Sequence, residues 1–135
     1  MMKQDAERNR QEGEAFLAQN ARKEGVRTRP SGLQYRVMRA SAGRTPKPTD
    51  TVVANYRGTF IDGTEFDSSY RRGQPFVFQV NKVIKGWVEA LQLMSAGAKW
   101  QLFIPARLAY GEPGSPPAIG PNATLIYEVE LLSIK

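Results

Sequence analysis

Two kinds of hydrophobic pattern divide the chain near residue 31. Residues 3–24 are rich in Glu, Gln, Ala, Lys and Arg, with one glycine and no proline, which predicts a helix. Its only large apolar residues are Phe16 and Leu17, so we interpret it as an exposed spacer or the remnant of a longer helical module. We expect Gly25 to end this helix, and residues 29–32 to break the chain again.

Beyond residue 31, apolar and polar residues alternate with the period of strands. Strands are predicted from Leu33, over residues 51–60, from Phe76, over residues 98–104 and over residues 123–135. The pair Asp62-Gly63 follows the second of these strands and predicts a type I′ hairpin.

One segment between the strands has helical spacing. Trp87, Ala90, Leu91 and Met94 predict a short amphipathic helix within residues 85–94. Without βαβ alternation, the order of elements indicates an α+β fold, in which a twisted antiparallel sheet wraps around one short helix. The N-terminal helix and linker occupy residues 1–30, and the globular domain occupies residues 31–135.

The composition excludes several kinds of chemistry. The 135 residues include no cysteine and no histidine, which excludes disulfides, thiolate nucleophiles, Ser-His-Asp triads and metal sites with Cys or His ligands. Asp62, Glu65 and Asp67 lie close together but lack the spacing of a calcium loop. We therefore expect no metal and no cofactor.

The charge pattern narrows the choice of partners. The net charge is +6, but no run of five or more Lys or Arg occurs, so we expect no nucleic-acid binding. No apolar run approaches the ~18 residues of a membrane span. The first residues contain no signal peptide, which predicts a cytoplasmic protein as the chain stands, or a periplasmic one if it was processed from an exported precursor.

Aromatic residues are numerous for a domain of this size. Most must be core, including Phe60, Phe78, Trp100 and Phe103. A single sheet with one helix has limited interior, so some rings are expected to line a small apolar pocket between helix and sheet.

Several motifs together resemble the FKBP-type peptidyl-prolyl cis-trans isomerases. The matching segments occur in family order at residues 56–58 (YRG), 62–69 (DGTEFDSS), 75–78 (PFVF), 83–87 (VIKGW), 108–111 (LAYG) and 121–131 (PNATLIYEVEL). The N-terminal part, at residues 13–17, 23–26 and 31–35, is similar to the bacterial Mip-like branch, at the junction where a long helix joins the isomerase domain. Most of that branch's dimerisation domain is missing here, so we expect a monomer.

The resemblance implies a set of residues that bind substrate. They are Tyr56, Phe66, Asp67, Phe76, Val83, Ile84, Trp87, Tyr110, Ile119 and Tyr127. Of these, Tyr56, Asp67, Trp87 and Tyr110 are the expected catalytic residues. Trp87 would form the floor under the proline ring, whereas Ile84 would offer its backbone N–H and Tyr110 its hydroxyl to substrate carbonyls. Arg72 is expected to pair with Asp67 or Tyr56.

The function implied is a rotamase that accelerates X-Pro bond rotation in folding proteins, without covalent or metal chemistry. Its partners would be proline-containing polypeptides and macrolides of the FK506 and rapamycin type. Two alternatives remain open. One is a module that binds proline peptides or macrolides with little turnover, and the other is a general chaperone whose loop at residues 109–121 holds unfolded chains.

Overall fold

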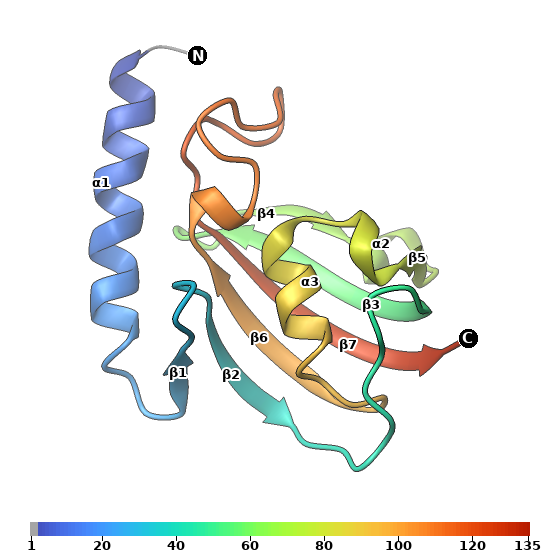
Figure 1. Cartoon of the computed structure of the whole chain (residues 1–135). Helices are drawn as coiled ribbons and strands as arrows, with labels where there is room; N and C mark the ends of the chain where they lie inside the picture. Colours follow the sequence, from blue (N-terminus) through green and yellow to red (C-terminus); the bar gives the residue numbers. More distant parts are fainter. Residues whose placement is uncertain (1–2) are drawn as a thin grey trace.

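A computed structural model describes residues 3–135 (Figure 1). Its elements are α1 (Lys3–Asn20), β1 (Val26–Thr28), β2 (Gln34–Arg39), β3 (Thr51–Phe60), β4 (Glu65–Ser68), α2 (Ser69–Arg72), β5 (Phe76–Gln79), the 3₁₀ turn η1 (Val80–Lys82), α3 (Lys85–Leu91), β6 (Lys99–Ile104), the 3₁₀ turn η2 (Ala106–Leu108) and β7 (Leu125–Ile134). Among these residues, none of the helices has the length and apolar character needed to span a bilayer.

All seven strands join one antiparallel sheet in the order β1-β2-β6-β7-β3-β4, and β5 also pairs with β3. The long strands β3 and β7 lie at its centre, with Tyr56 opposite Val129 and Gly58 opposite Tyr127. This arrangement confirms the α+β architecture predicted from the alternating pattern.

The core lies between the concave face of the sheet and α3, which crosses in front of the strands in Figure 1. The apolar positions predicted to share a face are buried there, namely Val52, Ala54, Tyr56, Ala98, Trp100, Leu102, Ile104, Leu125, Tyr127, Val129 and Leu131. From α3 and the turn after it come Trp87, Ala90, Leu91 and Met94. Leu33 and Val37 show the limit of the pattern, because Leu33, just before β2, is buried whereas Val37, within the strand, is 44% exposed.

The hairpin between β3 and β4 forms where predicted, but its turn is of another kind. A type I′ turn needs positive φ at both central residues. Here Gly63 has a φ of 90°, and Asp62 is not among the residues with positive φ. The bonds from Gly63 N to Phe60 O and from Phe60 N to Thr64 O instead close a three-residue loop with glycine in the left-handed position. Asp62 accepts from Thr64 N at 2.9 Å, so its side chain stabilises the turn.

The helix α1 packs on the side of the sheet opposite α3. Its Phe16 ring lies 6.1 Å from that of Phe103, a residue that alternates with the inward-facing Leu102 and Ile104. Asn20 and Gln34 are both buried, and the Asn20 amide donates to Gln34 Oε1 at 2.8 Å. The helix ends at Asn20, earlier than predicted, because turns between residues 21 and 25 reverse the chain toward β1.

Candidate functional site

A pocket of about 490 Å³ opens between the N-terminus of α3 and the concave face of the sheet. The central strands β3 and β7 contribute to it, together with β4 and β5, which both pair with β3, and the loop that follows η2. Its lining residues are Tyr56, Asp67, Phe76, Lys82, Val83, Ile84, Trp87, Tyr110 and Tyr127. The lining is thus mainly aromatic and aliphatic, with few polar groups, as in sites that bind apolar ligands.

Trp87 lies at the centre of an aromatic cluster and is only 4% exposed. The rings of Tyr56 and Tyr127 meet it edge to face, each with centroids 5.2 Å away, and Phe78 packs beside it at 5.5 Å. Edge-to-face contacts at these distances are favourable beyond the area that they bury. The indole N–H of Trp87 is buried and finds no acceptor within residues 3–135.

Gly58 leaves room for the rings of Phe66 and Tyr127. A Cβ at this position would lie 2.7 Å from Phe66 Cζ and 2.8 Å from Tyr127 Cε1, so any side chain there would push both rings away. Phe66 meets Tyr127 edge to face at 5.6 Å and packs on Phe60 at 4.9 Å. Phe66 therefore packs against Tyr127 and is not among the residues that line the pocket.

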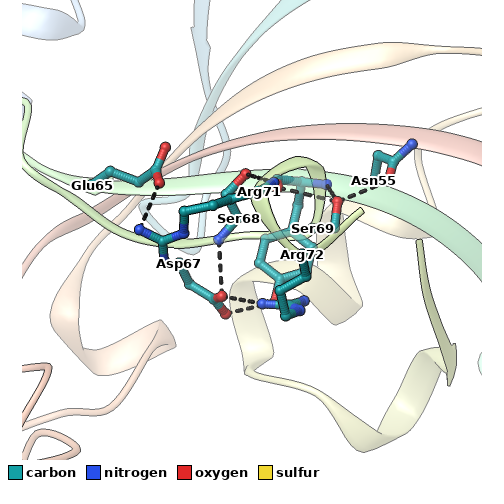
Figure 2. Close-up of polar contacts among 8 residues, drawn as sticks. Asn55, Glu65, Asp67, Ser68, Ser69, Arg71 and Arg72 are labelled. Atoms are coloured by element: carbon teal, nitrogen blue, oxygen red, sulfur yellow. Dashed lines mark hydrogen bonds and ion pairs between the residues drawn. The ribbon is translucent and has the colours of Figure 1, made fainter. Parts of the chain in front are cut away.

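The polar part of the pocket is a triangle of Tyr56, Asp67 and Arg72. The Tyr56 hydroxyl donates to Asp67 Oδ2 at 2.5 Å, and Arg72 Nη2 donates to the same hydroxyl oxygen at 2.9 Å. Arg72 Nη1 forms an ion pair with Asp67, drawn in Figure 2, and the backbone N–H of Ser68 donates to Asp67 Oδ1 at 2.8 Å. The expected pairing of Arg72 is confirmed with both partners.

This triangle sets the charge of its members. Burial and the hydrogen bond to the Asp67 carboxylate raise the pKa of Tyr56. Burial on its own would raise the pKa of Asp67, but the Tyr56 hydroxyl and the charge of Arg72 outweigh it and hold that pKa below its ordinary 3.8. Burial also raises the pKa of Tyr127. At neutral pH, Asp67 is therefore an anion and both tyrosines are neutral.

The short helix α2 positions Arg72. Ser68 caps it by accepting from Arg71 N, and Gly73 ends it with a φ of 80°. The fully buried Ser69 accepts from Tyr56 N and donates to Asn55 Oδ1, both at 2.8 Å, as Figure 2 shows for Asn55. This hydroxyl links α2 to β3 beside Tyr56, and it thereby fixes the position of Arg72 relative to Tyr56.

Two further groups offer hydrogen bonds at the pocket. Tyr110 lines it from the loop after η2 and is 38% exposed. The carbonyl of Ile84 accepts from Trp87 N and Val88 N, whereas its own N–H donates to no acceptor within the described chain. A free backbone donor beside an apolar floor can bind a carbonyl oxygen of a ligand.

The structure brings most of the sequence-predicted site residues together. Tyr56, Asp67, Phe76, Val83, Ile84, Trp87, Tyr110 and Tyr127 all line the pocket. Phe66 and Ile119 do not, because Phe66 packs against Tyr127 and Phe60, and Ile119 is buried in the hydrophobic core. Lys82 lines the pocket but was not predicted, since an exposed lysine in a turn has no distinguishing pattern.

The match to known protein families covers nearly the whole chain. The family model of FKBP-type peptidyl-prolyl cis-trans isomerases matches residues 42–132. The model of the domain amino terminal to FKBP-type peptidyl-prolyl isomerase matches residues 1–37. Both models therefore agree with the motifs read from the sequence.

Curated relatives are similar along this chain but are longer. Peptidyl-prolyl cis-trans isomerase Mip of Coxiella burnetii is 52% identical over 127 residues, which are 94% of this chain and 55% of that protein. An FKBP-type 22 kDa peptidyl-prolyl cis-trans isomerase of Escherichia coli is 54% identical over 123 residues, which are 91% of this chain and 60% of that protein. The chain thus spans little more than half the length of these relatives.

Solved structures agree with this assignment. The crystal structure of FkpA from Escherichia coli superposes with a TM-score of 0.94 at 48% identity, covering 98% of this chain and 62% of that one. A peptidyl-prolyl cis-trans isomerase from Pseudomonas syringae has a TM-score of 0.89 at 35% identity, covering 96% of both chains. The sequence, the aromatic pocket and these similarities together show that the chain belongs to the FKBP-type peptidyl-prolyl cis-trans isomerase family.

Proposed function

We propose that this chain catalyses the cis-trans isomerisation of X-Pro peptide bonds in polypeptides. The observation that carries the proposal is the apolar pocket in which the rings of Tyr56, Trp87 and Tyr127 surround a space beside the free N–H of Ile84. Family membership supports it, because the matching relatives are named peptidyl-prolyl isomerases.

The chemistry needs no nucleophile. Rotation is slow because the amide C–N bond has partial double-bond character, with a barrier of ~18–20 kcal/mol. In the twisted transition state this resonance is lost and the carbonyl carries less negative charge. An apolar pocket disfavours the polar planar amide more than the twisted one, so it lowers the barrier by differential binding. A lowering of ~4–7 kcal/mol would accelerate rotation by about 10³–10⁵.

We assign roles from the geometry. Trp87 is the floor on which the proline ring lies, and Tyr56, Phe76 and Tyr127 are walls. Ile84 N–H and the Tyr110 hydroxyl donate to carbonyls on either side of the rotating bond, which holds the chain while the amide twists. Asp67 is ionised and bonded to Tyr56 and Arg72, so it orients the wall and transfers no proton. Phe66 supports this lining through its edge-to-face contact with Tyr127, and Ile119 belongs to the buried core.

The partners follow from the same pocket. Proline-containing polypeptides are the proposed substrates, and macrolides of the FK506 and rapamycin type would occupy the pocket as competitors. We also propose that residues 31–135 form the isomerase domain, with residues 1–30 as its helical extension. The family match at residues 42–132 supports this division.

The test is a protease-coupled or NMR exchange assay on a short X-Pro peptide, with and without such a macrolide. We expect faster exchange that the macrolide abolishes. Macrolide binding measured by calorimetry, together with a rate equal to the uncatalysed one, would instead identify a binding module. A folded, ligand-free protein that neither binds nor accelerates would refute the proposal.

A further inference from the structure

We propose that α1 is a brace for the loop at residues 109–123, and that it thereby positions Tyr110 at the pocket. The first half of α1 lies against the end of this loop, as seen where the helix passes the orange loop in Figure 1. Asn9 Nδ2 donates to Pro121 O at 2.9 Å, and Asn122 Nδ2 donates to Ala6 O at 3.2 Å. Two amide side chains thus bond in opposite directions across the contact.

A close approach of the helix to the chain after the loop fixes the same contact. A Cβ on Gly13 would collide with Thr124 Oγ1, at a separation that no side chain tolerates. Gly13 is buried, and Thr124 is only 7% exposed. Ala6, Asn9 and Gly13 follow one another at helical spacing on one face of α1. The contact therefore covers two turns of the helix and is specific to this face.

The braced segment leads directly to two pocket residues. Asn122 has a φ of 52°, and its N–H donates to Gly111 O at 2.9 Å, next to Tyr110. Gly111 N in turn donates to Ala106 O at 2.8 Å, and mutual bonds between Ser115 and Ile119 close the loop upon itself. On the other side, β7 begins right after Thr124 and carries Tyr127.

The functional consequence rests on the proposed isomerase activity. A loop that is already ordered loses less conformational entropy when substrate binds, so a brace raises affinity. Because Tyr110 contacts substrate and the helix does not, α1 acts through Tyr110. Release of the helix should therefore raise KM and leave kcat nearly unchanged.

The central variant is Gly13→Ala. Alanine favours helix more than glycine, so α1 itself stays helical while the new Cβ blocks its contact with the loop. Thr124→Ala removes the obstructing oxygen, so the double variant should regain the contact. Asn122→Gly deletes the amide that reaches Ala6 but keeps a residue suited to positive φ. Gln11→Ala changes an exposed residue of the same helix and is the matched control.

Hydrogen exchange of the amides of Gly111, Ser115, Ile119 and Asn122 reads the brace without any assay of activity. We expect about fivefold to tenfold faster exchange in Gly13→Ala and Asn122→Gly, the scale of one lost hydrogen bond. KM for an X-Pro peptide should rise by a similar factor, and both changes should reverse in Gly13→Ala with Thr124→Ala. Gln11→Ala should match the original chain.

Three results would decide against the inference, each in its own way. Unchanged exchange in Gly13→Ala would overturn the brace. Faster exchange that persists in the double variant would assign the effect to the change within the helix alone and overturn it as well. Faster exchange with unchanged KM would overturn the link to Tyr110. If the original chain has no isomerase activity, the proposed function fails, and the exchange measurements still decide whether α1 holds the loop.

Discussion

The two sides of the sheet are built by different means. On the concave side, the rings of Tyr56 and Tyr127 pack edge to face on Trp87 and line the pocket with it. On the side of α1, buried amides such as Asn20 and Gln34 make directed hydrogen bonds, with one ring pair beside them. Burial of apolar area is strong and insensitive to direction, whereas hydrogen bonds are weaker and depend closely on geometry. We therefore expect the concave side to contribute most of the free energy of folding, and the α1 side to fix where the helix lies on the sheet.

Trp87→Ala tests the concave side and should have the largest effect. Loss of a buried indole from the centre of the ring cluster should lower the free energy of unfolding by ~3–5 kcal/mol. The isomerase rate constant kcat/KM should fall with it, because the pocket loses its floor. Urea unfolding and the X-Pro assay measure the two effects. Trp87→Leu, which keeps an apolar floor, is the control and should retain more of both.

Asp67→Ala should have a moderate effect on activity. It removes the acceptor of the Tyr56 hydroxyl and the partner of Arg72, so the wall loses its orientation while the apolar floor remains. We expect kcat/KM to fall by about tenfold, on the scale of one charge-assisted hydrogen bond. Asp67→Asn, which keeps an acceptor, should lose less. Equal activity in all three proteins would show that the triangle does not orient the wall.

The pH dependence separates orientation from proton transfer. Since the folded state lowers the pKa of Asp67 below 3.8, its contribution to stability is complete above that value and is lost as the pH falls through the folded pKa. Activity should be flat around neutral pH, and the difference in unfolding free energy between the original chain and Asp67→Asn should shrink only in acid. A steep rate profile near neutrality would contradict this role.

Asn20→Ala tests the α1 side far from the pocket. It leaves the buried Gln34 amide oxygen without its donor, which should cost ~1–3 kcal/mol of unfolding free energy. Neither kcat nor KM of the folded protein should change, because this end of α1 contacts the sheet and not the loop. Gln19→Ala, at an exposed position beside it, should be neutral. A change in kcat or KM in Asn20→Ala would contradict the view that only the first half of α1 affects the pocket.

Lys82→Gln should have the smallest effect. Lys82 is a lining residue for which no ion pair is found within residues 3–135, so it can favour an acidic residue near the substrate proline. For an exposed charge we expect a change in KM of about twofold or less, confined to acidic peptides and suppressed by salt. Steady-state kinetics on Glu-Pro and Lys-Pro peptides would measure it, and an equal change for both would exclude charge selection.

The sequence predicts the concave side of the sheet better than the side that α1 covers. The alternation at Val52, Ala54 and Tyr56 correctly places one face of a strand in the core, because burial of apolar side chains dominates there. Nothing comparable marks Asn9, Gly13 and Asn20, since polar or small residues on a polar helix predict solvent exposure. These three residues contact Pro121, Thr124 and Gln34, and the pattern along the helix does not indicate such distant partners.

For the pocket, the sequence predicts some features and misses others. Family motifs identify Trp87 and the tyrosines, because their order and spacing are specific. The same motifs do not distinguish a ring that lines the space from one that packs against a lining ring, as Phe66 does. The contact of Phe66 with Tyr127 depends on the absence of a side chain at Gly58, which becomes visible only when β3 and β7 are paired.

The place of β7 in the sheet has a consequence for how the protein itself matures. Of the strands described here it comes latest in the chain, yet it lies between β3 and β6 and bonds to both. Until it emerges, two edges of the nascent sheet lack their partner, and contacts that bridge distant parts of the chain form slowly. A chain proposed to speed the maturation of others must therefore wait for β7 before its own sheet can assemble.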